Sequence, residues 1–361
     1  MVLASIVSTS QTGSLELLAT QLNNPPALAN NSGSTVTVSL TATGQWTLIN
    51  FATSDPSLVK YKTPVDGNGH VRDKNDEKFG FKYPNLNPGA LVGEIKDAKG
   101  NTKSTVSGKQ QSFELQPGDT ISFVINDDPK WYADNTGKLT IAYSATAKKV
   151  SVLSFDGKDD YVALPAVNND YSQGFTVEAW VQYSSFQQSW SRIIEFGNGQ
   201  GQNNIVLGHV GTSKDIGFHL YTTAAFDKIE IANALEIGKW THIAVTISKS
   251  REGKLYQNGQ LVQSKLLLLP DNVNRKLNYI AKSNWPQDGY FEGKIAEVRV
   301  WNIARTPEEI KQNMNSRLRG NEPGLVGYYP LNGDANDKTS KANHGTINGA
   351  IWQQGEVPIT G

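Results

Sequence analysis

Thr120-Ile-Ser-Phe-Val-Ile125 and Lys138-Leu-Thr-Ile-Ala-Tyr143 flank the loop Asn126-Asp-Asp-Pro-Lys-Trp-Tyr-Ala-Asp-Asn-Thr-Gly137, and this stretch decides the fold of the first half of the chain. Apolar and polar residues alternate in both flanking runs, as they do in a strand with one buried face. The loop between them is rich in Asp, Asn, Pro and Gly, which favour turns. The stretch therefore predicts two β-strands joined by a polar loop.

The same loop is rich in side-chain oxygen atoms, which come from Asp127, Asp128, Asp134 and Asn135. A bent loop also turns backbone carbonyl groups inward, and calcium takes about six to eight oxygen ligands of these kinds. No nearby Cys or His indicates a softer metal. Because these residue types are also ordinary turn formers, the loop alone is compatible with a calcium site and with a plain turn.

The composition limits the functions that are open to the chain. Its 361 residues suggest two domains, and Lys+Arg balance Asp+Glu at 34 each. This neutral charge, without a basic patch, argues against nucleic acid or an anionic membrane as the main partner. The absence of Cys excludes disulfides and thiolate chemistry. We expect no signal peptide and no membrane insertion, and therefore a protein that is cytoplasmic or released by a non-classical route.

Short alternating runs and frequent turn residues predict an all-β protein. Residues 54–88 form a long polar connection, expected to lack regular structure and to carry function or cover the surface, and residues 145–149 are expected to link the two halves. One helix is predicted from Thr306 to about Met314, because Thr306, Pro307 and Glu309 form a capping box. Strands are expected at residues 14–18, 35–40, 44–50, 90–97, 111–115, 150–157, 175–181, 240–246 and 295–301.

A family resemblance in the first half rests on residues around the loop and its neighbouring strands. They are Gly44-Gln-Trp46, Pro88-Gly-Ala-Leu-Val92, Ile95, Pro117-Gly-Asp119, Asn126-Asp127, Pro129, Tyr132, Asn135 and Gly137. With them, residues 1–147 resemble the PA-I-like galactophilic lectins of bacteria, which are calcium-dependent β-sandwiches. The resemblance implies calcium ligands from the side chains of Asp127, Asp134 and Asn135 and from the backbone carbonyls of Trp131 and of a residue near Ile49. Asp134 stands where the family has Asn.

The same resemblance implies galactose-containing glycans as partners, held by the calcium ion and by hydrogen bonds that Asp127 and Asp134 accept from the sugar hydroxyls. The sugar-contacting loop of the family carries a His and a Gln. Residues 54–88 are longer than that loop and align poorly with it, and His70 and Asp76 are the candidates there for sugar contacts.

A second resemblance covers about residues 150–355. It rests on Phe155-Asp-Gly-Lys-Asp-Asp-Tyr161, Phe175-Thr-Val-Glu-Ala-Trp180, Phe291-Glu-Gly-Lys294, Glu297-Val-Arg-Val-Trp301 and Gly327-Tyr-Tyr-Pro-Leu-Asn-Gly333. These residues are similar to those of laminin-G-like, concanavalin A-type jelly rolls, and loosely to those of pentraxins. The resemblance implies a fold but no single function, because such jelly rolls serve as binding modules, spacers and enzyme appendages.

Charged side chains in the second half allow two interpretations. Alternation places Glu178 on one face of its strand and Glu297 and Arg299 on one face of theirs, and with His242 they would suit a glycosidase site. We favour cross-strand pairs on the open face of a sheet, and expect no enzymatic activity. Nearby tryptophans suit packing better than sugar stacking.

Acidic loops in the second half raise the question of a second metal site. Asp156, Asp159 and Asp160 either join the loop Asp334-Ala-Asn-Asp337 in holding calcium or belong to ordinary turns.

The sequence thus predicts an all-β chain of two β-sandwich domains, a galactose-binding-like sandwich at residues 1–147 followed by a concanavalin A-like jelly roll at residues 150–361. The predicted function is calcium-dependent carbohydrate binding. The jelly roll would serve as a second binding surface or as a module for homo-oligomerisation. The alternatives are a protein that binds protein partners, with the loop only a turn, and a glycoside hydrolase.

Overall fold

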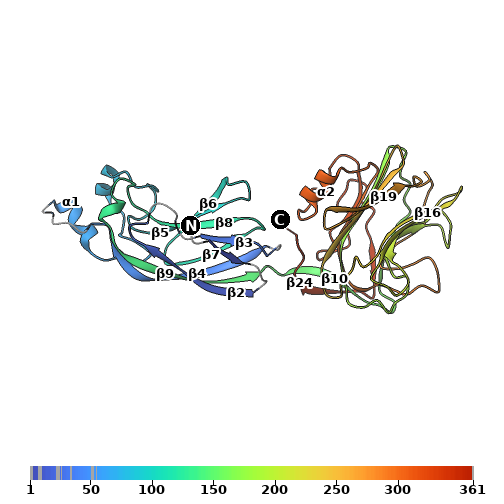
Figure 1. The fold of residues 1–361 in the computed structure, drawn as a ribbon, viewed down its shortest axis with the longest axis horizontal. Helices are drawn as coiled ribbons and strands as arrows, with labels where there is room; N and C mark the ends of the chain where they lie inside the picture. Colours follow the sequence, from blue (N-terminus) through green and yellow to red (C-terminus); the bar gives the residue numbers. More distant parts are fainter. Residues whose placement is uncertain are drawn as a thin grey trace. The chain divides into compact units, whose positions relative to one another are not determined.

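The chain divides into two compact units in the computed structural model, residues 1–148 and residues 149–359. The structure describes residues 3–6, 10–21, 25, 27–32, 35–49, 53 and 55–359. Both units consist mainly of antiparallel strands, so the predicted all-β class is confirmed (Figure 1). No helix among these residues has the length and apolar character needed to span a membrane.

Two sheets form the N-terminal unit, and the only parallel pair among its described strands is β1 with β3. The five-stranded sheet has the order β1 (Leu3–Ile6), β3 (Ala27–Asn30), β8 (Thr120–Ile125), β5 (Leu91–Lys96) and β6 (Thr102–Ser107). The four-stranded sheet has the order β2 (Ser10–Leu18), β9 (Thr136–Ala147), β4 (Val36–Thr47) and β7 (Gln110–Leu115). Buried side chains of both sheets, such as Val38, Ile141 and Phe123, form one apolar core.

Strands β4 and β9 form the longest pairing of this unit, from Val36 opposite Ala147 to Thr47 opposite Thr136. The two runs expected at residues 35–40 and 44–50 are therefore parts of one strand. Gly44 and Gly137 have φ angles of 109° and 102°, and a Cβ at either position would collide with a backbone carbonyl of the opposite strand. Glycine is therefore required at both positions. Both residues lie near the end of the β4–β9 pairing that adjoins the loop between β8 and β9.

The long connection after β4 contains regular structure, contrary to our expectation. Helix α1 (Pro56–Val59) begins after Asp55, whose side chain accepts a hydrogen bond from the Ser57 N–H. Two short 3-10 helices follow at Lys60–Lys62 and Lys74–Lys78. The second of these begins with a capping box between Asp73 and Asp76. These local caps allow a polar, glycine-rich segment to hold a fixed conformation.

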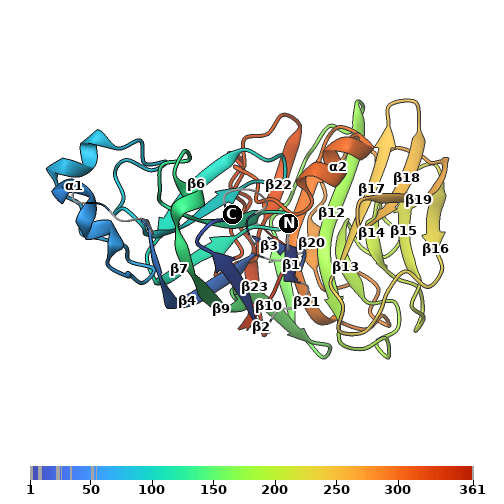
Figure 2. The same cartoon turned by 60° about the vertical axis from the view of Figure 1, so that its left-hand side comes forward.

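The C-terminal unit consists of two larger sheets packed face to face (Figure 2). The eight-stranded sheet contains β19 (Gln260–Leu266), β18 (Glu252–Gln257), β17 (Thr241–Ser248), β12 (Gly174–Tyr183), β21 (Glu292–Trp301), β10 (Val150–Asp156) and β24 (Ile351–Gly355), with β22 (Leu325–Tyr329) also paired to β21. The seven-stranded sheet has the order β16 (Phe226–Ile231), β15 (Ile216–Tyr221), β14 (Ile205–His209), β13 (Arg192–Gly197), β20 (Leu277–Ile280), β11 (Tyr161–Leu164) and β23 (Thr346–Asn348).

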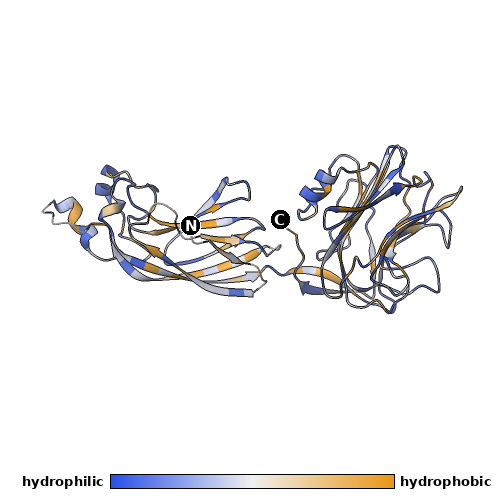
Figure 3. Ribbon diagram, in the orientation of Figure 1, coloured by the Kyte–Doolittle hydropathy of each residue, from blue (hydrophilic) through white to orange (hydrophobic). Residues whose placement is uncertain are grey.

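The core of the C-terminal unit lies between these two sheets. Val177 and Val245 of the larger sheet and Ile194 and Phe218 of the smaller one are all fully buried in it. Coloured by hydropathy, the strands change between apolar and polar along their length, as alternation requires (Figure 3). All four strands expected in this half are present, as β10, β12, β17 and β21.

Helix α2 (Pro307–Asn313) covers part of the outer face of the eight-stranded sheet, where Ile310 packs against Ala244 and Tyr256. The predicted capping box is confirmed, because the Thr306 hydroxyl accepts from the Glu309 N–H and the Glu309 carboxylate accepts from the Thr306 N–H. The segment between the two units is shorter than expected. Strand β9 ends at Ala147 and β10 begins at Val150, which leaves only residues 148 and 149 between them.

Candidate functional site

A cavity of about 210 Å³ lies beside the loop 126–135 of the N-terminal unit. Three segments line it: the residues just after β4, the connection 55–88, and the loop itself. Most of its lining atoms are apolar, and its carboxylates all belong to the loop. The lining residues are Leu48, Ile49, Leu58, Tyr61, Phe79, Phe81, Asp127, Asp128, Trp131 and Asp134.

Asn126 fixes the loop against the connection that precedes β5. Its side-chain oxygen accepts from the Tyr83 N–H at 2.9 Å, and its amide nitrogen donates to the carbonyls of Tyr83, Leu86 and Asn87 at 3.0–3.1 Å. Its backbone carbonyl accepts from the Gly89 N–H. Asn126 is therefore a positioning residue, and it directs the following Asp127 to the cavity.

Asp127 is a buried carboxylate, 5% exposed, without a cationic partner in the described structure. Its Oδ1 accepts from the Asp128 N–H at 2.8 Å and its Oδ2 accepts from Asn135 Nδ2 at 3.0 Å. Burial raises the pKa of Asp127 to about 6, although these two hydrogen bonds lower it. Ion pairs among the described N-terminal residues involve other carboxylates, namely Glu16, Asp66, Asp73, Asp76, Glu94, Glu114 and Asp119.

Two buried oxygen atoms near Asp127 lack a hydrogen-bond donor. They are Oδ1 of Asp134 and Oδ1 of Asn135. Burial also raises the pKa of Asp134. Buried polar atoms are nearly always satisfied in folded proteins, so these two acceptors beside Asp127 are available to a cation or to water. The donor set, made of carboxylate and amide oxygens without nitrogen or sulfur, fits a hard cation such as calcium.

The structure brings the five residues predicted to hold the metal close together. Asp127, Trp131, Asp134 and Ile49 line the same cavity, and Asn135 is hydrogen-bonded to Asp127. The opposite wall was not predicted from the sequence; it is formed by Leu58, Tyr61, Phe79 and Phe81 of the connection. Isolated apolar residues within a polar segment were the available signal, because a solvent-exposed loop has little reason to hold aromatic side chains.

Asp76 and His70, predicted to contact the sugar, do not line the cavity. Asp76 is fully buried behind Tyr61, where it accepts hydrogen bonds from the Tyr61 hydroxyl and the Asp73 N–H and pairs with Lys60 at 2.6 Å. His70 packs edge-on against the Tyr61 ring at 5.4 Å between ring centroids. Both residues support the cavity wall from behind.

An acidic cluster in the C-terminal unit offers a second place for a metal ion. One oxygen of each of Asp156, Asp159 and Asp160 lies within 4.8 Å of the others. The loop 334–337 does not join this cluster. Asp334 pairs with Lys338 at 2.8 Å, and the buried Asp337 accepts from the N–H groups of Tyr328, Thr339 and Asn343 and from the Thr339 hydroxyl.

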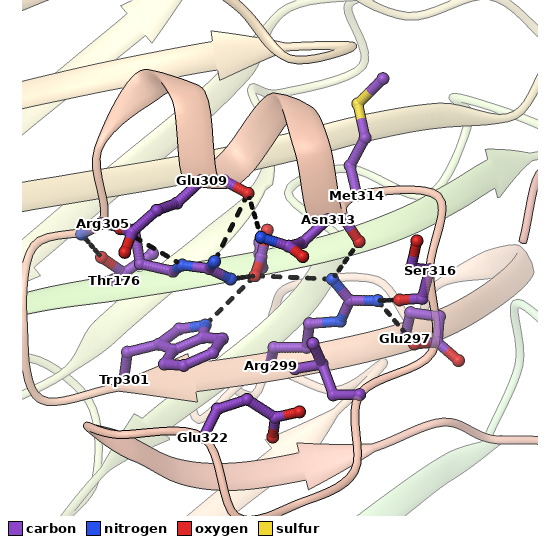
Figure 4. Close-up of polar contacts among 12 residues, drawn as sticks. Thr176, Glu297, Arg299, Trp301, Arg305, Glu309, Asn313, Met314, Ser316 and Glu322 are labelled. Carbon is purple, nitrogen blue, oxygen red and sulfur yellow. Dashed lines mark hydrogen bonds and ion pairs between the residues drawn. The ribbon is translucent and has the colours of Figure 1, made fainter. Parts of the chain in front are cut away.

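Glu178 is fully buried and is the centre of a polar network. Figure 4 shows Arg299, Trp301 and Arg305 of this network beside helix α2. Its Oε1 accepts from the Trp301 indole N–H at 3.1 Å and from Arg305 at 3.4 Å, and lies 3.7 Å from Arg299. His242 lies 3.2 Å from the other oxygen. Burial alone would raise the pKa of Glu178, but contacts with His242, Arg299 and Arg305 outweigh it and lower the pKa to about 2.

Arg299 connects this network to the segment that follows helix α2. Its guanidinium group donates to Glu297 at 2.8 Å and to the carbonyls of Asn313 and Ser316 at 3.1 and 2.7 Å (Figure 4). The expected cross-strand pair is present, because Glu178 lies opposite Arg299 in neighbouring strands. The expected open face is wrong, because Glu178, Glu297 and Arg299 are 0–2% exposed. A glycosidase needs two carboxylates that reach the substrate, whereas these two are held by arginines. We therefore interpret the network as structural.

Comparison with protein families gives a match in the C-terminal unit. Residues 156–311 match the concanavalin A-like lectin/glucanases superfamily, in agreement with the two packed sheets of the unit. The predicted concanavalin A-like jelly roll is thus confirmed for the second half. The superfamily includes both lectins and glucanases, so the match alone does not distinguish binding from hydrolysis. No curated protein sequence matches the chain.

Solved structures with similar folds include several proteins whose names refer to sugar binding. A protein of Bacteroides ovatus, to which carbohydrate binding is provisionally ascribed, has 19% identity and a TM-score of 0.44, over 99% of this chain and 97% of its own. A sialidase module of Ruminococcus gnavus bound to sialyllactose has 13% identity and a TM-score of 0.36, over 45% and 97%. A heptameric pentraxin of Limulus polyphemus has 16% and 0.38, over 57% and 95%. Scores this low do not identify a ligand.

Proposed function

We propose that the protein is a calcium-dependent lectin that binds galactose-type glycans at the cavity beside the loop 126–135. The observation that carries this proposal is the group of unsatisfied acceptors: Oδ1 of Asp134 and Oδ1 of Asn135, next to the buried Asp127 that lacks a cation. A bound cation would compensate this group of acceptors and the buried charge together, which water does less well. The concanavalin A-like fold of the C-terminal unit is compatible with a carbohydrate-binding protein.

Five groups would hold calcium at this site: the side chains of Asp127, Asp134 and Asn135 and the backbone carbonyls of Trp131 and Ile49. Calcium prefers about six to eight oxygen ligands, which leaves room for two neighbouring sugar hydroxyls. Calcium bound there would neutralise the carboxylates and orient those hydroxyls. Galactose is the sugar that the resemblance to PA-I-like lectins implies, through its vicinal 3- and 4-hydroxyls.

The residues of the chain supply the remaining contacts. Asp127 and Asp134 accept hydrogen bonds from the sugar hydroxyls, and bonds to charged acceptors are stronger than neutral ones. Trp131 is 56% exposed and lines the cavity, so its ring offers a flat surface to the apolar face of the sugar. A monosaccharide buries little area, and each site should bind with a Kd on the order of 0.1–1 mM.

Weak single sites become useful when several act together. The C-terminal jelly roll would provide the additional sites, either as a second binding surface or as a module for homo-oligomerisation.

A galactose resin tests the proposed function. The full chain should be retained in the presence of calcium and released by a chelator. Asp127→Ala should abolish retention, whereas Asp66→Ala, which removes a half-exposed carboxylate outside the cavity, should not. Circular dichroism of both variants checks that the fold is intact. Retention in chelator, or calorimetry without calcium uptake, would mean that the loop is only a turn. Failure to bind the resin even with calcium would favour a protein-binding function.

A further inference from the structure

We infer that Arg275 of the C-terminal unit binds a small monovalent anion, such as chloride or formate. Arg275 lies just before strand β20, and its backbone pairs with Val167 in an isolated bridge, with hydrogen bonds of 2.8 and 2.9 Å. The residue is 1% exposed, so its guanidinium group is held inside the unit. The inference goes beyond the proposed function and does not depend on it, because the loop 126–135 belongs to the other unit.

Arg275 differs from the other buried arginines in the described part of the chain, because it has no acidic partner. Those arginines form ion pairs, namely Arg192 with Glu195 and Asp288, Arg299 with Glu178 and Glu297, and Arg305 with Glu178. The chain thus supplies a counter-charge to each of the other buried guanidinium groups. The charge of Arg275 has none among the described residues.

The side chain of Arg275 makes one hydrogen bond with the described residues. Its Nε donates to the Asn203 carbonyl at 2.8 Å, whereas its Nη2 is buried and has no acceptor. The guanidinium group also lies 5.8 Å from the centroid of the Tyr171 ring. Such a cation–π contact attracts the positive charge but supplies no counter-charge. Nη2 therefore marks the place where an acceptor is missing.

Deprotonation does not remove this charge. Burial lowers the pKa of Arg275, but arginine remains protonated in folded proteins. A buried charge without a counter-charge is strongly unfavourable. A water molecule accepts a hydrogen bond from Nη2 but carries no net charge, whereas an anion supplies both the acceptor and the charge, and hydrogen bonds of this kind are the stronger ones. An anion therefore suits the site better than water.

A second cation is connected to the same aromatic ring. Lys341 Nζ donates to Asn169 Oδ1 at 2.6 Å, and Asn169 Nδ2 donates to the Tyr171 hydroxyl at 3.2 Å. Neither Lys341 nor Arg275 forms an ion pair with a described residue. Positive charge therefore approaches the Tyr171 ring from two directions, which favours a negative ligand.

Two carboxylates on neighbouring segments are bonded to other groups. Asp271 accepts from the Thr223 N–H at 2.7 Å, and Asp170 accepts from the Asn272 side chain at 2.6 Å. Asp271 attracts Arg275 from beyond ion-pair distance, and this attraction is weaker than the effect of burial, since the pKa of Arg275 falls overall. Neither carboxylate replaces an anion at Nη2.

The surroundings of Arg275 favour a small anion. The residues on both sides of it, Asn274 and Lys276, are exposed, and so is Gly201 in the loop that contributes the Asn203 carbonyl. A Cβ on Gly201 would meet no atom within 4 Å, so the outer side of this loop is open. An ion thus has a short way in, whereas a guanidinium group this buried is out of reach of a sugar acid.

Thermal unfolding of the full chain in chelator tests the inference. Sodium bromide and sodium formate are compared with sodium gluconate at equal ionic strength, with bromide in the place of chloride and gluconate as an anion too large for the site. At about ten times its Kd, the anion should raise the Tm of the C-terminal transition by about 3–6 °C relative to gluconate. A rise with bromide alone assigns a halide site, and a rise with formate alone assigns a carboxylate site. No rise with either would overturn the inference.

Two arginines supply matched variants. Arg251 Nε also donates to a backbone carbonyl, that of Leu267 at 3.1 Å, but Arg251 is exposed. We expect Arg275→Met to abolish the response to bromide and formate, and Arg251→Met to leave it unchanged. In gluconate, Arg275→Met should be at least as stable as the wild type, because it removes a buried charge without a partner. A response that persists in Arg275→Met, or a loss of stability in gluconate, would contradict the anion site.

Crystals of the wild type test the position of the anion without a variant, which covers the case in which Arg275→Met does not fold. They are grown with bromide, or with formate if only formate raises the Tm. Bromide is located by its anomalous scattering and formate by its shape in the electron density, and the anion should contact Arg275 Nη2. A water molecule at Nη2, or anions found only at exposed side chains, would mean an adventitious ion only and would refute the inference.

Discussion

Asp127 and Glu178 are both buried carboxylates, yet their surroundings are opposite. Glu178 has two arginines, an indole N–H and His242 around it, and the pKa of its carboxyl falls to about 2. Asp127 has one backbone N–H and one amide, and the pKa of its carboxyl rises to about 6. The first charge is satisfied within the chain, whereas the second is not.

The difference separates a structural network from a candidate binding site. A buried charge is tolerated only when something compensates it, and at Glu178 the protein itself supplies the compensation. At Asp127 the described residues supply two hydrogen bonds but no cation, and the proposed calcium ion would supply the remaining compensation. The pKa is shifted at both carboxylates, so a shift alone does not indicate a functional site. The direction of the shift and the charged partners of the group are more informative.

The largest effect should follow the loss of the Glu178 charge. Glu178→Gln leaves Arg299 and Arg305 without their shared anion, and breaking a buried pair in this way costs about 3–5 kcal/mol. Because six of the eight tryptophans lie after residue 149, urea unfolding followed by tryptophan fluorescence reports mainly on the C-terminal unit. The folded pKa of Glu178 lies below the unfolded one, so its contribution is complete above about pH 4.5 and should disappear toward pH 2. A variant as stable as the wild type at pH 7 would show that the network is not structural.

For Asp127, we expect the stability to change with pH in the opposite direction. Its folded pKa lies above the unfolded value of 3.8, so without calcium its ionisation makes the folded state less stable as the pH rises from about 4 to 6. In chelator at pH 7, Asp127→Asn should therefore be more stable than the wild type by about 2 kcal/mol, and the two should converge near pH 4. Scanning calorimetry of the N-terminal transition measures this difference. Saturating calcium should reverse the order, and an order unchanged by calcium would remove the metal from the site.

A smaller effect is expected at Asp76, where the test distinguishes support of the cavity wall from a part in the calcium site. Asp76→Asn keeps the shape but weakens the contacts with Lys60 and the Tyr61 hydroxyl, so we expect a loss of about 1–2 kcal/mol in stability. Calcium affinity should not change, since Asp76 does not line the cavity. Calorimetric titration with calcium checks this, and a large fall in affinity would place Asp76 in the site after all.

The smallest effect on stability is expected for an exposed ion pair, which serves as the control for the buried carboxylates. Glu16 and Lys138 form an ion pair with side chains 52% and 59% exposed. Glu16→Gln should change the free energy of unfolding by less than about 0.5 kcal/mol, because water screens such pairs. A change as large as that of Asp76→Asn would mean that burial does not explain the difference in stability effect between these carboxylates.

The loop 126–137 was predictable because the residues that specify it are adjacent in the sequence. Two alternating runs around a cluster of turn formers specify two strands and their connection, and the oxygen-bearing side chains that line the cavity could be named from the sequence. The capping box of α2 is local in the same way, since Thr306 and Glu309 are three residues apart.

The rest of the site depends on contacts between distant segments. Leu58 and Phe81 are isolated in a polar stretch, and only the folded chain brings them opposite Asp127. Alternation placed Glu178 and Arg299 on the correct face of their sheet. It carried no information about where the segment containing α2 would pack, and that packing turns an open face into a buried one.

The hydrogen bonds of Asn126 affect how the N-terminal unit unfolds locally. Its side chain holds Tyr83, Leu86 and Asn87, and the carbonyl of the next residue accepts from the Lys82 N–H. The loop and the segment around residue 85 should therefore unfold together, as one cooperative unit. In native-state hydrogen exchange, the amides of Lys82, Tyr83 and Gly89 should exchange with a common opening free energy. Any ligand that orders the loop would then slow exchange more than 40 residues earlier in the chain.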